Sequence, residues 1–151
     1  MRRWVVVWAF AAGLAASGAT QAATCAPPGG EAAAVQAVRD FFAALHADDE
    51  AAYRRSVTDG FYAYDAGKAF HGDELFGQVK SVHAQGRRID WMVAEPRVEM
   101  VCDTALITYV NKSVVGDAKG MQPVDWLESA WLRYQDGRWR LAFLDSQRAA
   151  P

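Results

Sequence analysis

Apolar residues recur at every third or fourth position in the first third of the chain, which is the spacing of amphipathic helices. From Glu31 to about Ala47 this apolar face consists of Val35, Val38, Phe42 and Leu45. Asp48 and Asp49 end the pattern and predict the N-cap of a short second helix that runs to about Ser56. A third helix is predicted from Glu74 to about Ala84, because acidic residues favour the positive end of a helix.

The rest of the chain alternates apolar and polar residues with the two-residue period of half-buried strands. The clearest case is a hairpin around Asp136 and Gly137, a pair that readily adopts the positive φ angles of a tight turn. The predicted strands are 61–64, 89–100, 105–115, 124–134 and 138–147. We expect Pro96 to lie at a bend or a sheet edge, and residues 116–123 to form a mobile loop. The order predicts an α+β domain in which a strongly curved antiparallel sheet packs against three N-terminal helices.

The first 23 residues have the pattern of a signal peptide. Arg2 and Arg3 precede an apolar run at 4–14, and small residues at 20–23 form a cleavage zone. We therefore predict a signal peptide at 1–23, a flexible lead-in at 24–30, a domain at 31–151, and a periplasmic or secreted protein without stable membrane insertion after cleavage. An uncleaved anchor is the alternative, although the apolar run is short for a membrane span.

The charge of the chain argues against a nucleic-acid partner. Loss of Arg2 and Arg3 on cleavage would change the formal net charge from −2 to −4, and the basic residues form no stripe of the kind that contacts phosphates. The three histidines show no spacing typical of a zinc site, so we expect neither a metal nor a cofactor.

The chain has two cysteines, Cys25 and Cys102. In an oxidising compartment a disulfide could join them. Lipid modification of Cys25 is the other interpretation, but the residues before it do not match a lipoprotein signal.

Five short segments, in this order, carry a family resemblance. They are Val38-Arg-Asp-Phe-Phe-Ala-Ala-Leu45, Tyr62-Ala-Tyr-Asp65, His71-Gly72, Cys102-Asp-Thr-Ala-Leu-Ile-Thr108 and Asp136-Gly-Arg-Trp-Arg140. Together they resemble the nuclear-transport-factor-2-like superfamily, which includes ketosteroid isomerase and the SnoaL-like domains, over about Glu31 to Gln147. The resemblance implies a conical α+β barrel with a pocket at its wide end, commonly dimeric through the sheet. Because this fold hosts enzymes, ligand binders and adaptors, it does not fix the function.

The resemblance places Asp65 where the isomerases have their catalytic base, beside Tyr64. A desolvated carboxylate at that position could move a proton, although a turn-capping aspartate is the plainer interpretation. The two oxyanion donors of the isomerases fall on Phe41 and Ala130, neither of which has a hydroxyl or an acid group. Loss of one donor typically lowers the rate by about a hundred- to a thousandfold, so the usual isomerase chemistry is not expected and enzymatic activity stays open.

Strand alternation suggests a replacement for the missing donors. If Ala130 points into the pocket, then Trp126 and Glu128 point the same way. Glu128 is thus a second candidate acid or base, and Tyr64, Trp126, Ala130 and Phe41 are candidate ligand contacts. A strand bulge would reverse this alternation and leave Glu128 in solvent.

Two functions follow from these residues. The first is an exported pocket protein, without a cofactor, that binds a small apolar or aromatic molecule with one polar group. If it is an enzyme, proton transfer through Asp65 is the expected reaction class. The second is a non-catalytic interaction module, homodimeric through its sheet, with Trp131 and Trp139 as packing or dimer-face residues.

Overall fold

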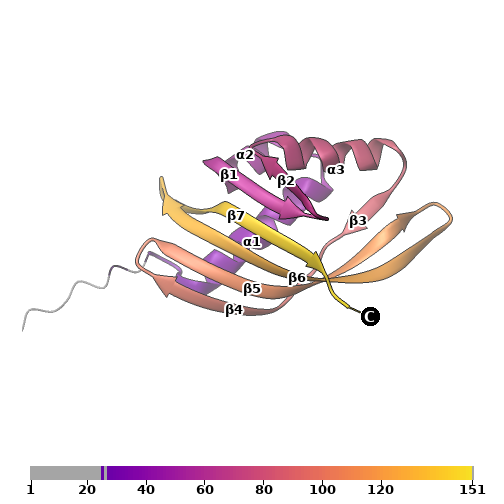
Figure 1. The fold of residues 1–151 in the computed structure, drawn as a ribbon. Helices are drawn as coiled ribbons and strands as arrows, with labels where there is room; N and C mark the ends of the chain where they lie inside the picture. The colour runs from indigo at the N-terminus through magenta and orange to yellow at the C-terminus, as the bar shows by residue number, and fades with distance from the viewer. Residues whose placement is uncertain (1–24, 26, 151) are drawn as a thin grey trace, which may run out of the picture.

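The computed structural model describes residues 25 and 27–150, and these form three helices against one face of a seven-stranded sheet. The helices are α1 (Gly30–His46), α2 (Glu50–Ser56) and α3 (Glu74–Ala84). Asp49 caps α2 as predicted, since its carboxylate accepts from the Ala52 amide at 2.9 Å. In Figure 1 the strands pass in front of α1, and no helix covers their front face.

The sheet is long, twisted and open. Its strands are β1 (Val57–Asp65), β2 (Lys68–His71), β3 (Arg88–Asp90), β4 (Val93–Val101), β5 (Thr104–Asp117), β6 (Gly120–Gln135) and β7 (Arg138–Arg148). They are ordered β2-β1-β7-β6-β5-β3, with β4 also paired to β5. The predicted α+β architecture is confirmed. The sheet is mixed rather than all antiparallel, because β1 pairs in parallel with β7, and it does not close into a barrel.

Three local expectations were wrong. The strand β2 was missed, because four mostly exposed residues are too few to show alternation. The predicted strand 89–100 is split at Trp91 and Met92, where the Met92 amide donates to the Asn111 side chain. The predicted loop 116–123 is the paired tip of the β5–β6 hairpin, with Asp117 opposite Gly120.

The core lies between the inner face of the sheet and the helices. Its largest fully buried side chains are aromatic and aliphatic: Tyr53, Phe41, Phe61, Leu45, Ile107, Leu132, Leu141 and Val38. Phe41, Phe61 and Tyr53 contact one another with ring centroids 5.6–6.2 Å apart. This aromatic cluster fills the space between the helices and the inner face of the sheet at that point.

A disulfide joins the lead-in to the sheet. Cys25 and Cys102 are bonded, with Cα atoms 4.7 Å apart, which confirms the disulfide interpretation. The predicted signal peptide, residues 1–23, lies outside the described residues. None of the helices within 27–150 is long and apolar enough to cross a membrane.

Candidate functional site

Four polar residues form one row across the inner face of the sheet. Asp65 on β1 lies opposite Ser146 on β7, Ser146 lies opposite Glu128 on β6, and Glu128 lies opposite Tyr109 on β5. Neighbouring strands are about 4.8 Å apart, so the row brings two carboxyl groups to one place from residues 63 positions apart in the chain.

Three residues of this row, Asp65, Glu128 and Ser146, line an inner cavity of about 220 Å³. Its polar lining consists of Asp65, Glu128, Ser146 and, among the basic residues, Arg87. Its aromatic walls are Phe42, Trp91 and Trp126. Aliphatic side chains complete it: Leu45, Leu75, Val79, Val82, Ile89, Val115 and Leu144. The cavity is therefore an apolar chamber with acidic groups on one wall, as ligand pockets usually are.

Glu128 is the most buried acidic side chain of this wall, with 7% of its surface exposed. Its Oε1 accepts from Ser146 Oγ at 2.9 Å, and its Oε2 accepts from Asn111 Nδ2 at 3.0 Å. Asn111 is fixed in turn, because its Oδ1 accepts from the Met92 amide and from Ser113 Oγ. Burial raises the pKa of Glu128 to about 6, although the hydrogen bonds from Asn111 and Ser146 oppose that rise.

Asp65 is the half-buried partner of Glu128. Burial raises its pKa, while the Ser146 hydroxyl and the Ala66 amide act in the opposite direction. The charge of Asp65 also contributes to the raised pKa of Glu128. Burial raises the pKa of the Tyr109 hydroxyl, and the neighbouring Glu128 carboxylate adds to that rise. Two neighbouring carboxyl groups with raised pKa values mark this wall as a candidate acid-base site.

The predicted inward alternation of β6 is confirmed, and it brings Trp126 and Glu128 together with Asp65 at the cavity. Three other predicted contacts do not line it. Tyr64 is 50% exposed on the outer face, where it packs against Phe143, because adjacent strand residues point to opposite faces. Phe41 and Ala130 are fully buried in the core and do not line the cavity.

Several residues of the site were not foreseen from the sequence. Tyr109 and Asn111 continue the inward alternation of Ile107 along β5, so the period of two could have identified them. The sequence pattern does not identify the other three site residues, Ser146, Trp91 and Arg87. Their place at the cavity depends on strand pairing and on the turn after α3.

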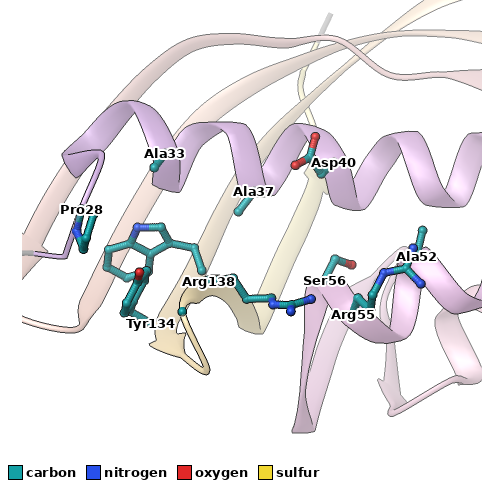
Figure 2. A pocket seen from close by; sticks show the side chains of 11 residues that line it. Pro28, Ala33, Ala37, Asp40, Ala52, Arg55, Ser56, Tyr134 and Arg138 are labelled. Atoms are coloured by element: carbon teal, nitrogen blue, oxygen red, sulfur yellow. The ribbon is translucent and has the colours of Figure 1, made fainter.

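A second hollow is an open groove of about 580 Å³ between α1, α2 and the β6–β7 turn. Figure 2 shows its small side chains Ala33 and Ala37 on α1, with the Arg138 side chain extending toward Arg55 and Ser56. Its charged groups are exposed, and it contains no buried ionisable side chain like Glu128. We therefore take the inner cavity as the candidate site.

A family model for the SnoaL-like domain matches residues 34–146, which include the whole cavity wall. The chain belongs to the SnoaL-like domain family. No curated protein matches this SnoaL-like domain in sequence.

Solved structures confirm the nuclear-transport-factor-2-like fold of this SnoaL-like domain. A ketosteroid isomerase-like protein from Erwinia carotovora atroseptica has a TM-score of 0.64 at 21% identity, over 80% of this chain and 96% of its own. A candidate dehydratase of this fold family from Streptomyces avermitilis has a TM-score of 0.68 at 14% identity, over 79% and 95%. The CaMKII hub from S. rosetta has a TM-score of 0.62 at 17% identity, over 78% and 95%. At these identities the likeness shows the fold alone.

In the SnoaL-like domain as described, no group of three or more histidine, cysteine or acidic residues could hold a metal ion. The ionisable groups of the acidic cavity wall are the carboxyl groups of Asp65 and Glu128.

Proposed function

We propose that this SnoaL-like domain is an exported protein that binds a small molecule in the inner cavity. The observation that carries the proposal is the buried carboxyl group of Glu128, held by Asn111 and Ser146 at the wall of an otherwise apolar chamber. Burial of an ionisable group lowers the stability of a fold unless the group is well partnered. A binding role accounts for its presence, because a few fixed polar groups orient a ligand in an apolar pocket.

The ligand is small and largely apolar. At about 220 Å³ the cavity is smaller than the roughly 300–1,000 Å³ of common ligand pockets. Phe42, Trp91 and Trp126 offer ring faces and edges to a flat or compact molecule. One polar group of the ligand would lie against Glu128 and Asp65.

If the domain is an enzyme, proton transfer without a cofactor is the reaction class that fits. Asp65 would act as the base, and Glu128 would return the proton or hold the polar group. The route of the ketosteroid isomerases is not proposed. Phe41 and Ala130, which stand at the donor positions, have no proton to offer and lie outside the cavity.

Native mass spectrometry of the mature protein, isolated gently from the envelope fraction, tests the binding function. We expect an added mass of a few hundred daltons that is lost on mild activation and is absent from the Glu128→Gln and Asp65→Asn proteins. A clean mass of the bare chain in every preparation, together with no binding in a broad fragment screen, would contradict the proposal.

A second candidate function is that of an interaction module, dimeric through the outer face of the sheet. An outer apolar row crosses this face, formed by Leu106, Trp131, Phe143 and Tyr62 on four neighbouring strands. Leu106 is 43% exposed and Trp131 is 36% exposed, and contiguous exposed apolar surface often marks an interface. Two of the similar solved structures are CaMKII hub domains. The occupant we propose is a second copy of this chain.

The two functions are separable by experiment, because the cavity and the outer apolar row lie on opposite faces. Variants of Glu128 should alter ligand capture and leave association unchanged. Variants of Trp131 should weaken association and leave ligand capture unchanged.

A further inference from the structure

The inner cavity has an imbalance of charge. Asp65 and Glu128 both line it, and neither forms an ion pair with any residue in the described part of the chain. The side chains that hydrogen-bond to Glu128 oxygens, Asn111 and Ser146, are neutral donors. A buried carboxylate is ordinarily paired with a cation, so this wall lacks the positive charge that would complete it.

Arg87 does not supply that charge. It is the one basic residue in the cavity lining, and its side chain is exposed at the turn after α3. Since it forms no ion pair with Asp65 or Glu128, the position beside both carboxyl groups is open to a ligand.

The aromatic walls favour the same kind of ligand. Phe42 and Trp91 pack with ring centroids 5.6 Å apart, and Trp126 lies on the strand that carries Glu128. Indole and phenyl faces attract cations through their quadrupoles, most strongly where water is excluded. A carboxylate and aromatic rings in one chamber therefore attract the same positive charge from two sides.

We propose that the ligand of the inner cavity is a small hydrophobic amine, bound in its protonated form with the ammonium group against Glu128 and Asp65. This inference rests on the proposed function and adds the ligand class. The apolar part of the amine would lie between Trp91, Trp126 and the aliphatic residues of α3.

Affinity should follow the ionisation of the acidic wall. The groups that face Glu128 are Asp65 on β1, Tyr109 and Asn111 on β5, and Ser146 on β7, with Arg87 at the rim. With a pKa of about 6, Glu128 is mostly protonated at about pH 5 and mostly ionised at about pH 7.5. Alkylammonium groups stay protonated up to about pH 10, so amine affinity should rise roughly tenfold between these two values.

Three probes of one shape test the charge preference. Phenethylamine, phenethyl alcohol and phenylacetate share a benzene ring and differ in the polar end. We expect calorimetric titration of the mature protein to show phenethylamine bound at least about tenfold more tightly than phenethyl alcohol at about pH 7.5, and phenylacetate bound most weakly. Chemical-shift changes at the Trp126 and Trp91 indoles would place the amine in the cavity.

Matched variants locate the effect. Glu128→Gln should weaken phenethylamine binding at least about tenfold and change phenethyl alcohol binding little. Glu99→Gln, on the exposed face of β4, makes the same chemical change outside the cavity and should leave both affinities unchanged. Asp65→Asn provides a second test, and the wild-type probe series decides the matter if the Glu128 variant does not fold.

The outcomes separate this inference from the proposed function. Equal or tighter binding of phenethyl alcohol or phenylacetate would overturn the amine inference and leave a small-molecule pocket in place. If phenethylamine fails to bind while other compounds bind, the amine inference is likewise overturned and the small-molecule pocket stands. Absence of any binding from a broad fragment library would overturn both.

Discussion

Asp48 fixes the junction between the first two helices through both its backbone and its side chain. Its φ angle is 53°, in the left-handed region that aspartate and asparagine tolerate better than most residues. Its Oδ1 lies 2.8 Å from Nδ1 of His83, which is 4% exposed on α3. The pair therefore joins α1 to α3 and sets the position of the helix that covers the cavity.

Asp48→Ala should destabilise the protein by about 2–4 kcal/mol, because it strains the left-handed backbone and leaves a buried histidine nitrogen without its partner. Asp48→Asn should cost about 1 kcal/mol or less, because asparagine tolerates the backbone angle and still offers an acceptor. Urea unfolding of the two variants beside wild type measures the difference. Equal losses would show that neither the angle nor the hydrogen bond matters.

Glu128 should give the protein an unusual pH dependence. Its pKa is raised from 4.5 to about 6 in the folded state, so the folded protein binds this proton more tightly than the unfolded chain. Its favourable contribution is fully present below about pH 4.5 and is lost as pH rises through about 6, by about 2 kcal/mol. Unfolding free energies measured across this window should show the fall in wild type and a smaller one in Glu128→Gln. If both proteins lose the same unfolding free energy across this pH range, a group other than Glu128 causes the loss.

At the scale of elements, strong periodicity was predictive and short or irregular segments were not. The apolar face of α1 and the alternation around Asp136-Gly137 were readable because each buries one side over many residues. The strand β2 has too few residues to show a period. The break between β3 and β4 depends on Asn111, a residue on another strand. Parallel pairing of β1 with β7 is likewise a tertiary feature that no local pattern encodes.

Gly116 permits the close strand pairing at the tip of the β5–β6 hairpin, which was predicted to be a loop. A Cβ atom at this position would overlap the carbonyl oxygen of Gly120 and lie 2.8 Å from the Met121 Cα. Gly116→Ala should therefore open the pairing of the tip and cost about 1–3 kcal/mol locally. Hydrogen exchange should show faster amides near Val115 and Gln122 with little change near Leu132. Unchanged protection at the tip would contradict this account.

The disulfide should stabilise the attachment of α1 to the sheet. It closes a loop between residues 77 positions apart, for which the chain-entropy model gives an upper value of about 4–5 kcal/mol. We expect Cys25→Ser to lower the unfolding free energy by about 2–4 kcal/mol, and Cys102→Ser to match it. Denaturation of wild type with and without a reducing agent checks the result. The serine variants should not respond to the reducing agent.

At the scale of the whole molecule, the candidate site was predictable only in part. Asp65 was identified through the family resemblance, and Trp126 and Glu128 through strand alternation counted from Ala130. The structure brings all three to one cavity. Tyr64 was assigned to the wrong face because it was treated as the neighbour of Asp65, although neighbours on a strand point apart. Ser146 and Trp91 join the site through sheet register and the turn after α3, which are properties of the assembled fold.

The same sheet separates two surfaces of opposite character. Its inner face carries the acidic cavity, and its outer face carries the outer apolar row with Trp131 near its centre. Arg133 lies over the Trp131 ring, 4.8 Å from its centroid, and covers part of it. A second copy could cover the remainder without blocking the cavity.

Trp131→Glu should therefore weaken self-association and preserve ligand binding. A charge in the middle of an apolar interface loses a large aromatic contact and must be desolvated, so the dimer should dissociate at a concentration at least about tenfold higher. Sedimentation equilibrium of the purified protein measures the change. Gln122→Glu, an exposed change near the hairpin tip on the same strand, introduces the same charge outside the outer apolar row and should leave association unchanged.

Two outcomes would contradict this account. A wild-type protein that is monomeric at all concentrations would rule out the dimer. Equal weakening by both variants would attribute the effect to net charge rather than to the outer apolar row.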